Sequence, residues 1–240
     1  GSVALSQVNH IGRLGEYAQM LAERGLIGLV MTAGSMVGGS VTPYAGRERR
    51  FSTNPMAWAV PVQDGRAPLV LDFATSMVAE GKLQVARSKG LPVPEDWIYD
   101  REGRASTDPN VFYDGGMLRT FGSYKGSGLS MMIEIVATLL SGFAPVSTSG
   151  FKLGNPTVMI ALQIERFTAL DHFEQMVDEL IERVQATPPA EGFEEVLVPG
   201  EPEARSYAQR VQDGIPLPDS VWQELAGLAN ELGVPLPDGV

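Results

Sequence analysis

The sequence predicts an α/β protein with a mixed sheet flanked by helices. An amphipathic segment at residues 11–24 is followed directly by an apolar run at 26–32, which is the helix-then-strand order of an α/β layer. Alternating apolar residues at 157–164 predict a further strand. The chain has 240 residues and is 44% hydrophobic, so it is long and apolar enough to bury a core.

Charge and residue counts exclude several classes of function. The formal net charge of −11 argues against binding to nucleic acid or to an anionic membrane. Cysteine is absent, which excludes disulfides and thiol nucleophiles and favours a cytoplasmic location. Two histidines are too few for a multi-histidine site, so no metal is expected. No apolar run approaches the ~20 residues that span a bilayer.

The N-terminal half predicts two helices and several strands. Asn9 is expected to cap the helix at 11–24, which Gly25 ends. Residues 34–55 form a polar loop whose three arginines are either a carboxylate clamp or, by default, a solvated loop or interface. These arginines are Arg47, Arg49 and Arg50. The chain opens at Val3 either with a strand or with a cut inside a longer protein. The other elements expected here are strands at 26–32, 56–62 and 67–73, a turn at Asp64-Gly65, and a helix at 77–89.

The C-terminal half predicts further helices and strands. A helix at 125–140 is expected to bury Leu129, Met132, Ile133, Val136, Leu139 and Leu140. Thr168 and Asp171 form a capping pair for a helix that runs to about Gln185. The remaining elements are a short strand at 196–198 and helices at 203–212 and 219–232, the last ended by Gly233.

Two polar clusters near predicted helix and strand ends are candidate ligand contacts. His10 lies at the expected N-terminus of the first helix, where it either meets an anionic ligand or merely caps the helix. Thr53 and Asn54 lie between the arginine-rich loop and a strand. Their side chains can bond a ligand, although Asn-Pro is also a common loop signal.

The segment Val70, Leu71, Asp72, Phe73, Ala74, Thr75, Ser76 ends an apolar strand with polar residues. Ligands of α/β sheets bind at strand ends, so Asp72 is a candidate to accept from a ribose hydroxyl or to transfer a proton. Thr75 and Ser76 are candidates to bond phosphate. The alternative is that Thr75 or Ser76 simply caps the helix expected from Met77.

A glycine-rich segment at 122–128 opens the helix at 125–140. Its glycines permit close backbone approach, and Lys125 adds a positive charge at the helix N-terminus, which favours a phosphate or carboxylate. The alternative is a flexible loop with a solvated lysine. The G-x-G-x-x-G fingerprint of the Rossmann fold is absent.

Several motifs in fixed order resemble the malate/L-lactate dehydrogenase type-2 family, which includes L-sulfolactate dehydrogenase. They are NHIGRLGEYA at 9–18, RRFSTNPMAWAVP at 49–61, VLDFATS at 70–76 with AEGK at 79–82, YKGSGLSMMIE at 124–134, EEVLVPGEPE at 194–203 and GIPLPDSVWQEL at 214–225. The resemblance implies the L-sulfolactate dehydrogenase-like, non-Rossmann fold of that family. It also implies a homodimer that transfers a hydride between NAD or NADP and a small 2-oxo or 2-hydroxy acid.

By this resemblance, His10 lies near the nicotinamide and substrate, and Asp72 handles protons in some members. The implied cofactor contacts are residues 70–76, Lys125, Gly126, Pro199, Gly200 and Glu201, and the substrate-side candidates are Thr53 and Asn54. Residues 3–150 would form the cofactor-binding region, and residues 151–240 would complete the same fold.

One departure from the family concerns its helical N-terminal segment, which carries a catalytic His and carboxylate-binding residues. Nothing in residues 1–9 corresponds to it. The resemblance therefore leaves an alternative function, a non-catalytic relative that keeps only cofactor binding or dimer formation.

Overall fold

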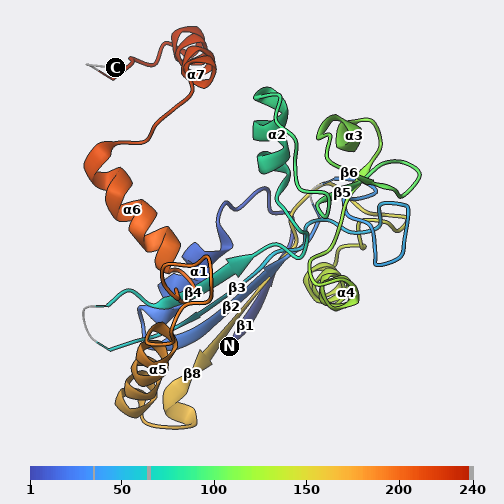
Figure 1. Cartoon of the computed structure of the whole chain (residues 1–240). Coiled ribbons are helices and arrows are strands. Elements are labelled where there is room, and N and C mark those ends of the chain that lie inside the picture. Colours follow the sequence, from blue (N-terminus) through green and yellow to red (C-terminus); the bar gives the residue numbers. More distant parts are fainter. Residues whose placement is uncertain (35, 64–65, 238–240) are drawn as a thin grey trace. The chain divides into compact units, whose positions relative to one another are not determined.

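The computed structural model describes residues 1–34, 36–63 and 66–237 (Figure 1). Contacts divide the chain into two compact units, Gly1–Gly200 and Glu201–Val240. The first unit contains every strand of the described chain and the helices that pack on them. The turn predicted at Asp64-Gly65 lies outside the described residues.

A five-stranded sheet forms the centre of the first unit, with the strand order β1-β8-β2-β3-β4. Its strands are β1 (Ser2–Leu5), β2 (Leu26–Thr32), β3 (Met56–Val60), β4 (Leu69–Phe73) and β8 (Thr157–Gln163). The predicted strands at 26–32, 56–62, 67–73 and 157–164 are thus confirmed to within two residues at each end.

Neighbouring strands of this sheet are antiparallel in all four pairs, where the sequence predicted a mixed sheet. β1 and β2 are both antiparallel to β8, which lies between them, so they run in the same direction without touching. The helix between them therefore makes a split β-α-β crossover. The helix-then-strand order in the sequence reflects this crossover, but it carries no information about the strand that inserts from residues 157–163.

Helix α1 (Leu14–Ala22) covers one face of the sheet over β2, β3 and β4. Its buried side chains pack on Val30 and on Ala57 and Ala59 of β3. Close approach requires Gly28, because a Cβ there would lie 2.6 Å from the Ala18 carbonyl oxygen. The prediction that Asn9 caps the helix is wrong, since Arg13 precedes α1 without a side-chain cap. Gly12, with φ +78°, keeps the preceding residues out of the helix.

The opposite face of the sheet is apolar and partly open. The register places Leu29 beside Trp58, and Trp58 beside Leu71. Trp58 is 39% exposed and Leu71 is 40% exposed. A large apolar surface that stays in contact with water is typical of an interface.

A second apolar cluster forms around a small three-stranded sheet with the order β6-β5-β7. The buried side chains of Ile98 and Leu118 lie in it, and Trp97 packs against it. The elements of this region are α2 (Glu80–Ser88), β5 (Ile98–Tyr99), β6 (Ala105–Ser106), α3 (Asn110–Tyr113) and β7 (Met117–Leu118).

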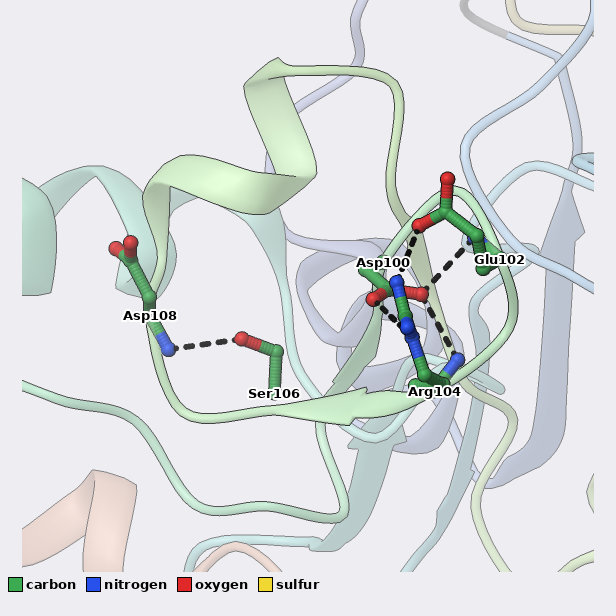
Figure 2. Close-up of polar contacts among 5 residues, drawn as sticks. All are labelled: Asp100, Glu102, Arg104, Ser106 and Asp108. Atoms are coloured by element: carbon green, nitrogen blue, oxygen red, sulfur yellow. Dashed lines mark hydrogen bonds and ion pairs between the residues drawn. The ribbon is translucent and has the colours of Figure 1, made fainter.

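The turn between β5 and β6 is held by one carboxylate (Figure 2). Asp100 accepts from the backbone N–H groups of Glu102 and Arg104 and from the Arg104 guanidinium, each at 2.9 Å. The backbone hydrogen bond from Arg104 is the main cause that lowers the pKa of Asp100. Beyond the turn, the Asp108 N–H donates to Ser106 (Figure 2).

Helix α4 (Tyr124–Leu140) begins within one residue of the predicted start, but its buried face differs in part from the predicted one. Its buried residues are Gly126, Ser130, Ile133, Glu134, Ala137 and Thr138. Of the predicted buried residues, Met132, Leu139 and Leu140 are exposed. Ile133 is buried as predicted, but the other buried residues of α4 are small or polar, and part of the predicted apolar stripe faces outward.

Helix α5 (Leu170–Gln185) follows β8 and the 3-10 turn at Ile164–Arg166. The predicted capping pair Thr168 and Asp171 is wrong, because Ala169 occupies the N-cap without a side-chain bond. The helix buries Asp178 and Ile181. Asp178 accepts from the Arg66 guanidinium at 2.6 Å and from the Gln63 N–H at 3.2 Å, so a buried carboxylate joins α5 to the segment after β3.

The second unit contains α6 (Glu201–Asp213) and α7 (Asp219–Leu232), and neither helix has a buried residue. Gly233 ends α7 in a left-handed conformation, as predicted. The short strand predicted at 196–198 does not form. Among the described residues, no helix is both long and apolar enough to span a membrane.

Candidate functional site

The predicted cofactor-binding segment 70–76 is contacted at its two ends by Gly200 and by the residues just before α4. Gly200 lies against β4, because a Cβ added there would be 2.9 Å from the Val70 carbonyl oxygen. At the other end of β4, the Phe121 N–H donates to the Thr75 carbonyl at 3.0 Å. Ser76 forms a β-bridge with Thr120, only a few residues before α4 begins.

Thr75 and Ser76 turn their hydroxyl groups into the protein. Thr75 is fully buried, and its hydroxyl donates to the carbonyls of Thr53 and Asn54 at 2.9 and 3.1 Å. The Ser76 hydroxyl donates to the Val78 carbonyl at 2.8 Å. Neither residue caps a helix, since α2 begins at Glu80. The capping alternative for these residues is therefore wrong, and the structure joins Thr75 to the substrate-side candidates Thr53 and Asn54.

The N-terminus of α4 is packed tightly against the segment that precedes it. Ser123 adopts φ +62° directly before the helix. A Cβ added to Gly126 would clash with the Phe121 carbonyl oxygen, so only glycine permits the helix to approach Phe121 this closely. Phe121 also meets Phe73 of β4 edge-to-face, with ring centroids 5.5 Å apart. Lys125 is exposed beside these groups.

A cleft of about 260 Å³ opens next to the α4 N-terminus. The Arg119 guanidinium forms part of its wall and lies 4.6 Å from the centre of the Tyr99 ring. Its other lining residues are Thr42, Pro43, Tyr44, Ala45, Met77, Asp96, Thr120, Gly122 and Ser123. The cleft thus combines a cation, a carboxylate, hydroxyl groups and backbone from a helix N-terminus.

Asp72 lies on the face of β4 that α1 covers, and its carboxylate caps that helix. The Gly15 N–H donates to Asp72 Oδ2 at 2.7 Å. Arg13 Nη2 and Asp72 Oδ2 each lie 3.0 Å from the position of a Cβ on Gly15, so a cation and a carboxylate converge there. A carboxylate at a helix N-terminus is electrostatically favourable.

His10 is exposed in the loop before α1, not at the helix N-terminus that the sequence predicted. Two hydrogen bonds to backbone carbonyls hold the chain around it. The Tyr17 hydroxyl donates to the Ile11 carbonyl at 2.8 Å, and the Asn155 N–H donates to the Val8 carbonyl at 2.8 Å. The imidazole is therefore carried on an anchored loop and remains open to solvent.

The arginine-rich loop does not form the carboxylate clamp considered from the sequence. Arg49 is half-buried, donates to the carbonyls of Phe112 and Gly116, and stacks 4.8 Å from the Phe112 ring centre. Burial lowers the pKa of its guanidinium. Arg50 pairs with Glu48.

Glu201, a predicted cofactor contact, begins the second unit, where it pairs with Arg205 at 2.6 Å.

Sequence reasoning missed one residue of this region, Glu134. It is 3% exposed, in the middle of α4. Burial raises the pKa of its carboxyl above the ordinary 4.5, and this effect outweighs hydrogen bonds from Val146, Asn54 and Ser52, which lower it. The available signal was a single acidic residue that interrupts the apolar run at 129–140.

No cluster of three or more metal-ligating side chains occurs among residues 1–34, 36–63 and 66–237. The groups that the structure does gather are N–H donors, hydroxyls and single charges. These suit an organic anion with phosphate or carboxylate groups.

Comparisons with known proteins agree on one family. The family model for malate/L-lactate dehydrogenase matches residues 1–226. The malate dehydrogenase of Pyrococcus horikoshii is 36% identical over 98% of this chain and 67% of its own length. The L-lactate dehydrogenase of Cupriavidus necator is 35% identical, covering 98% of this chain and 68% of that protein. The chain thus spans about two thirds of the length of these curated relatives.

A solved structure supports the same assignment. The sulfolactate dehydrogenase of Methanocaldococcus jannaschii superimposes with a TM-score of 0.82 at 30% identity, covering 98% of this chain and 67% of that one. The predicted L-sulfolactate dehydrogenase-like fold is therefore confirmed. Its antiparallel sheet also explains why the Rossmann fingerprint is absent, since that fingerprint belongs to a parallel β-α-β unit. By sequence and by fold, this chain belongs to the malate/L-lactate dehydrogenase family.

Proposed function

We propose that this chain contributes the cofactor-binding part of an oxidoreductase that transfers a hydride between NAD(P)H and a small 2-oxo or 2-hydroxy acid. The observation that carries the proposal is that Gly200 and the segment leading into α4 contact the two ends of the 70–76 segment. The relatives, which are named malate and L-lactate dehydrogenases, support the substrate class.

The donor set at this site fits a nicotinamide dinucleotide. The exposed Lys125 and the N-terminus of the 17-residue helix α4 favour the negative charge of its phosphates. Asp72 and the backbone of β4 offer acceptors for hydroxyl groups. Pro199, Gly200 and Glu201 are further proposed contacts. When bound, the nicotinamide supplies the hydride.

The chain's own residues would then bind the 2-oxo or 2-hydroxy acid and transfer a proton to or from it. His10 is the proposed acid–base group, because it is exposed and an imidazole can both donate and accept a proton. Thr53 and Asn54 are proposed on the substrate side. Asp72 is the second candidate for proton transfer. Its bond to the Gly15 N–H also gives it a structural role that must be separated by experiment.

The second candidate function is a non-catalytic relative that keeps only cofactor binding or self-association. It is favoured by the exposed apolar surfaces of α4 and of the main sheet, which fit self-association. Turnover by this chain would exclude it, whereas binding without turnover would support it.

The test is a fluorescence titration of the 240-residue chain with NADH and with NADPH, followed by turnover assays with a panel of 2-oxo acids. We expect at least one cofactor to bind, and the two Kd values decide between NAD and NADP. Lys125→Ala should weaken binding about tenfold, which corresponds to one phosphate contact. Lys152→Ala removes another exposed lysine and serves as the control. If neither cofactor binds, the proposal is wrong.

We also propose that the protein is a homodimer. Two exposed apolar surfaces support this state: the outward stripe of α4, and the sheet face that carries Trp58 and Leu71. The exposed stripe consists of Met131, Met132, Ile135, Leu139 and Leu140 and contains no charged side chain. Two-fold symmetric dimers are the commonest oligomers, and in them the same surface of each subunit forms the interface.

A further inference from the structure

Glu134 is a buried carboxyl that the proposed reaction does not use. Its Oε1 accepts from the Val146 N–H at 2.6 Å, and its Oε2 accepts from Asn54 Nδ2 at 2.8 Å. The backbone N–H of Ser52 is a third donor. One side chain of α4 therefore binds two separate loops, and all three of its contacts are N–H groups that favour a carboxylate acceptor.

Asn54 is held in one orientation by these contacts. Its side chain is fully buried, and Nδ2 also lies 3.0 Å from the Ser130 carbonyl and 3.1 Å from the Ser130 hydroxyl. Three acceptors around one amide nitrogen fix which end of the amide faces α4. The opposite atom, Oδ1, is buried without a hydrogen-bond partner in the described part of the chain. The φ angle of Asn54 is +39°. Both features are unfavourable locally, so the contacts to α4 must hold the residue in place.

The contacts continue from Asn54 to the proposed cofactor site and return to α4. The carbonyls of Thr53 and Asn54 accept from Thr75, and the Thr75 carbonyl accepts from the Phe121 N–H. Phe121 packs against Gly126 in the first turn of α4. The strand end at Thr75 is thus tied to α4 at two points, once through Glu134 and once through Phe121.

We propose that Glu134 is a positioning residue that, by fixing Asn54, sets the spacing between the strand end at Thr75 and the α4 N-terminus at Lys125. The inference rests on the proposed function, because these are two of the segments assigned to the cofactor. Glu134 itself is buried and does not touch the ligand. Its effect is carried by Asn54 and Thr75.

The first test replaces Glu134 by glutamine. Glu134→Gln keeps the shape of the side chain but turns an NH₂ group toward an N–H donor, so one of the contacts becomes repulsive. We expect the Kd for the cofactor that the wild type binds to rise at least tenfold in protein that remains folded. Arg66→Ala, which breaks the distant contact to Asp178, is the control for lost stability. Its Kd should stay within twofold of the wild type.

The second test uses pH, because stability and binding should move in opposite directions. The pKa of Glu134 is raised in the folded protein, so its contribution to stability is greatest below about pH 4.5 and is lost as pH rises through the folded pKa. The positioning of Asn54 instead requires the ionised form of Glu134, so binding of the cofactor should weaken as pH falls through the same range. The groups facing the carboxyl are N–H donors, and no charged side chain contributes to the shift of its pKa.

Comparing the pH profiles of the wild type and Glu134→Gln also separates the effect of Glu134 from that of His10. Glu134→Gln retains His10, so the difference between the wild-type and variant profiles belongs to Glu134. If Glu134→Gln does not fold, Ser130→Ala replaces it. This variant removes only one contact of Asn54 and should raise the Kd about threefold.

The outcomes distinguish this inference from the proposed function. A wild type that binds neither NADH nor NADPH overturns both. A wild type that binds, with an unchanged Kd in the folded variant, overturns only the role of Glu134. A binding profile that follows the stability profile with pH also overturns it, since a purely structural residue would produce that result.

Discussion

Asp72 combines two roles that a pair of substitutions can separate. Its carboxylate accepts from the Gly15 N–H and so caps α1. Asp72→Ala removes this acceptor and should lower the free energy of unfolding by about 1–2 kcal/mol. Asp72→Asn keeps an oxygen in the same place and should cost less, with the loss limited mainly to the ~0.3–1 kcal/mol of charge at a helix N-terminus. Urea denaturation measures both values.

The activity of these two variants then tests the catalytic proposal. If Asp72 handles a proton, Asp72→Asn lowers kcat strongly while its stability stays close to that of the wild type. If Asp72 acts only as a cap, the asparagine variant keeps its activity, and the alanine variant loses activity only in proportion to its unfolded fraction. Retained turnover in Asp72→Asn would therefore remove Asp72 from the catalytic residues.

The local chemistry of single residues was read from the sequence more reliably than their partners. Thr53, Asn54 and Thr75 were each identified as polar residues at strand ends, and the structure brings them into direct contact. Glu134 was not identified, because its three donors come from residues up to 82 positions away in the chain. A sequence pattern cannot show which distant N–H groups will surround a carboxyl.

At the scale of elements, two glycines of α4 predict opposite effects. Gly126→Ala places a Cβ into the Phe121 carbonyl and should destabilise the protein by about 1–3 kcal/mol. Gly128 has open space around its Cα, so Gly128→Ala should stabilise the helix by up to about 1 kcal/mol. Thermal unfolding of the two variants checks the prediction. Equal shifts of Tm in the same direction would contradict the packing described for Phe121.

A second element-scale prediction concerns the contact between α5 and the segment after β3. Asp178 is buried and accepts from both Arg66 and the Gln63 N–H. Asp178→Ala should lower the free energy of unfolding by about 2–3 kcal/mol, because it leaves these donors without an acceptor. Glu179→Ala breaks only the exposed pair with Arg183 and should cost at most about 0.5 kcal/mol. Similar losses in both variants would mean that Asp178 contributes no more than a surface charge.

The elements themselves were largely predictable, but their faces and neighbours were not. Hydrophobic periodicity located the strands of the main sheet and the start of α4. It located only part of the buried face of α4. Ile133 is buried as predicted, but the other residues that pack inward are small or polar, such as Gly126 and Ser130. It also predicted a mixed sheet, because the order of elements does not reveal that β8 inserts between β1 and β2.

At the scale of the whole molecule, the outward stripe of α4 is the surface that the dimer proposal makes testable. Met132 and Leu139 are 56% and 55% exposed, seven residues apart on one face of the helix. A charge at either position would be buried in a dimer without a partner, which costs several kcal/mol. The double variant Met132→Lys and Leu139→Lys should therefore sediment as a monomer at concentrations where the wild type is a dimer.

The control for this experiment places a lysine on another exposed apolar side chain of the same unit. Met176 on α5 is 44% exposed, and Met176→Lys should leave self-association unchanged because it lies outside the stripe. If the stripe variant remains a dimer, the sheet face around Trp58 becomes the candidate contact, and Trp58→Lys tests it in the same way. If the wild type is monomeric at all concentrations, both surfaces must be covered by something other than a second copy, and the homodimer proposal is wrong.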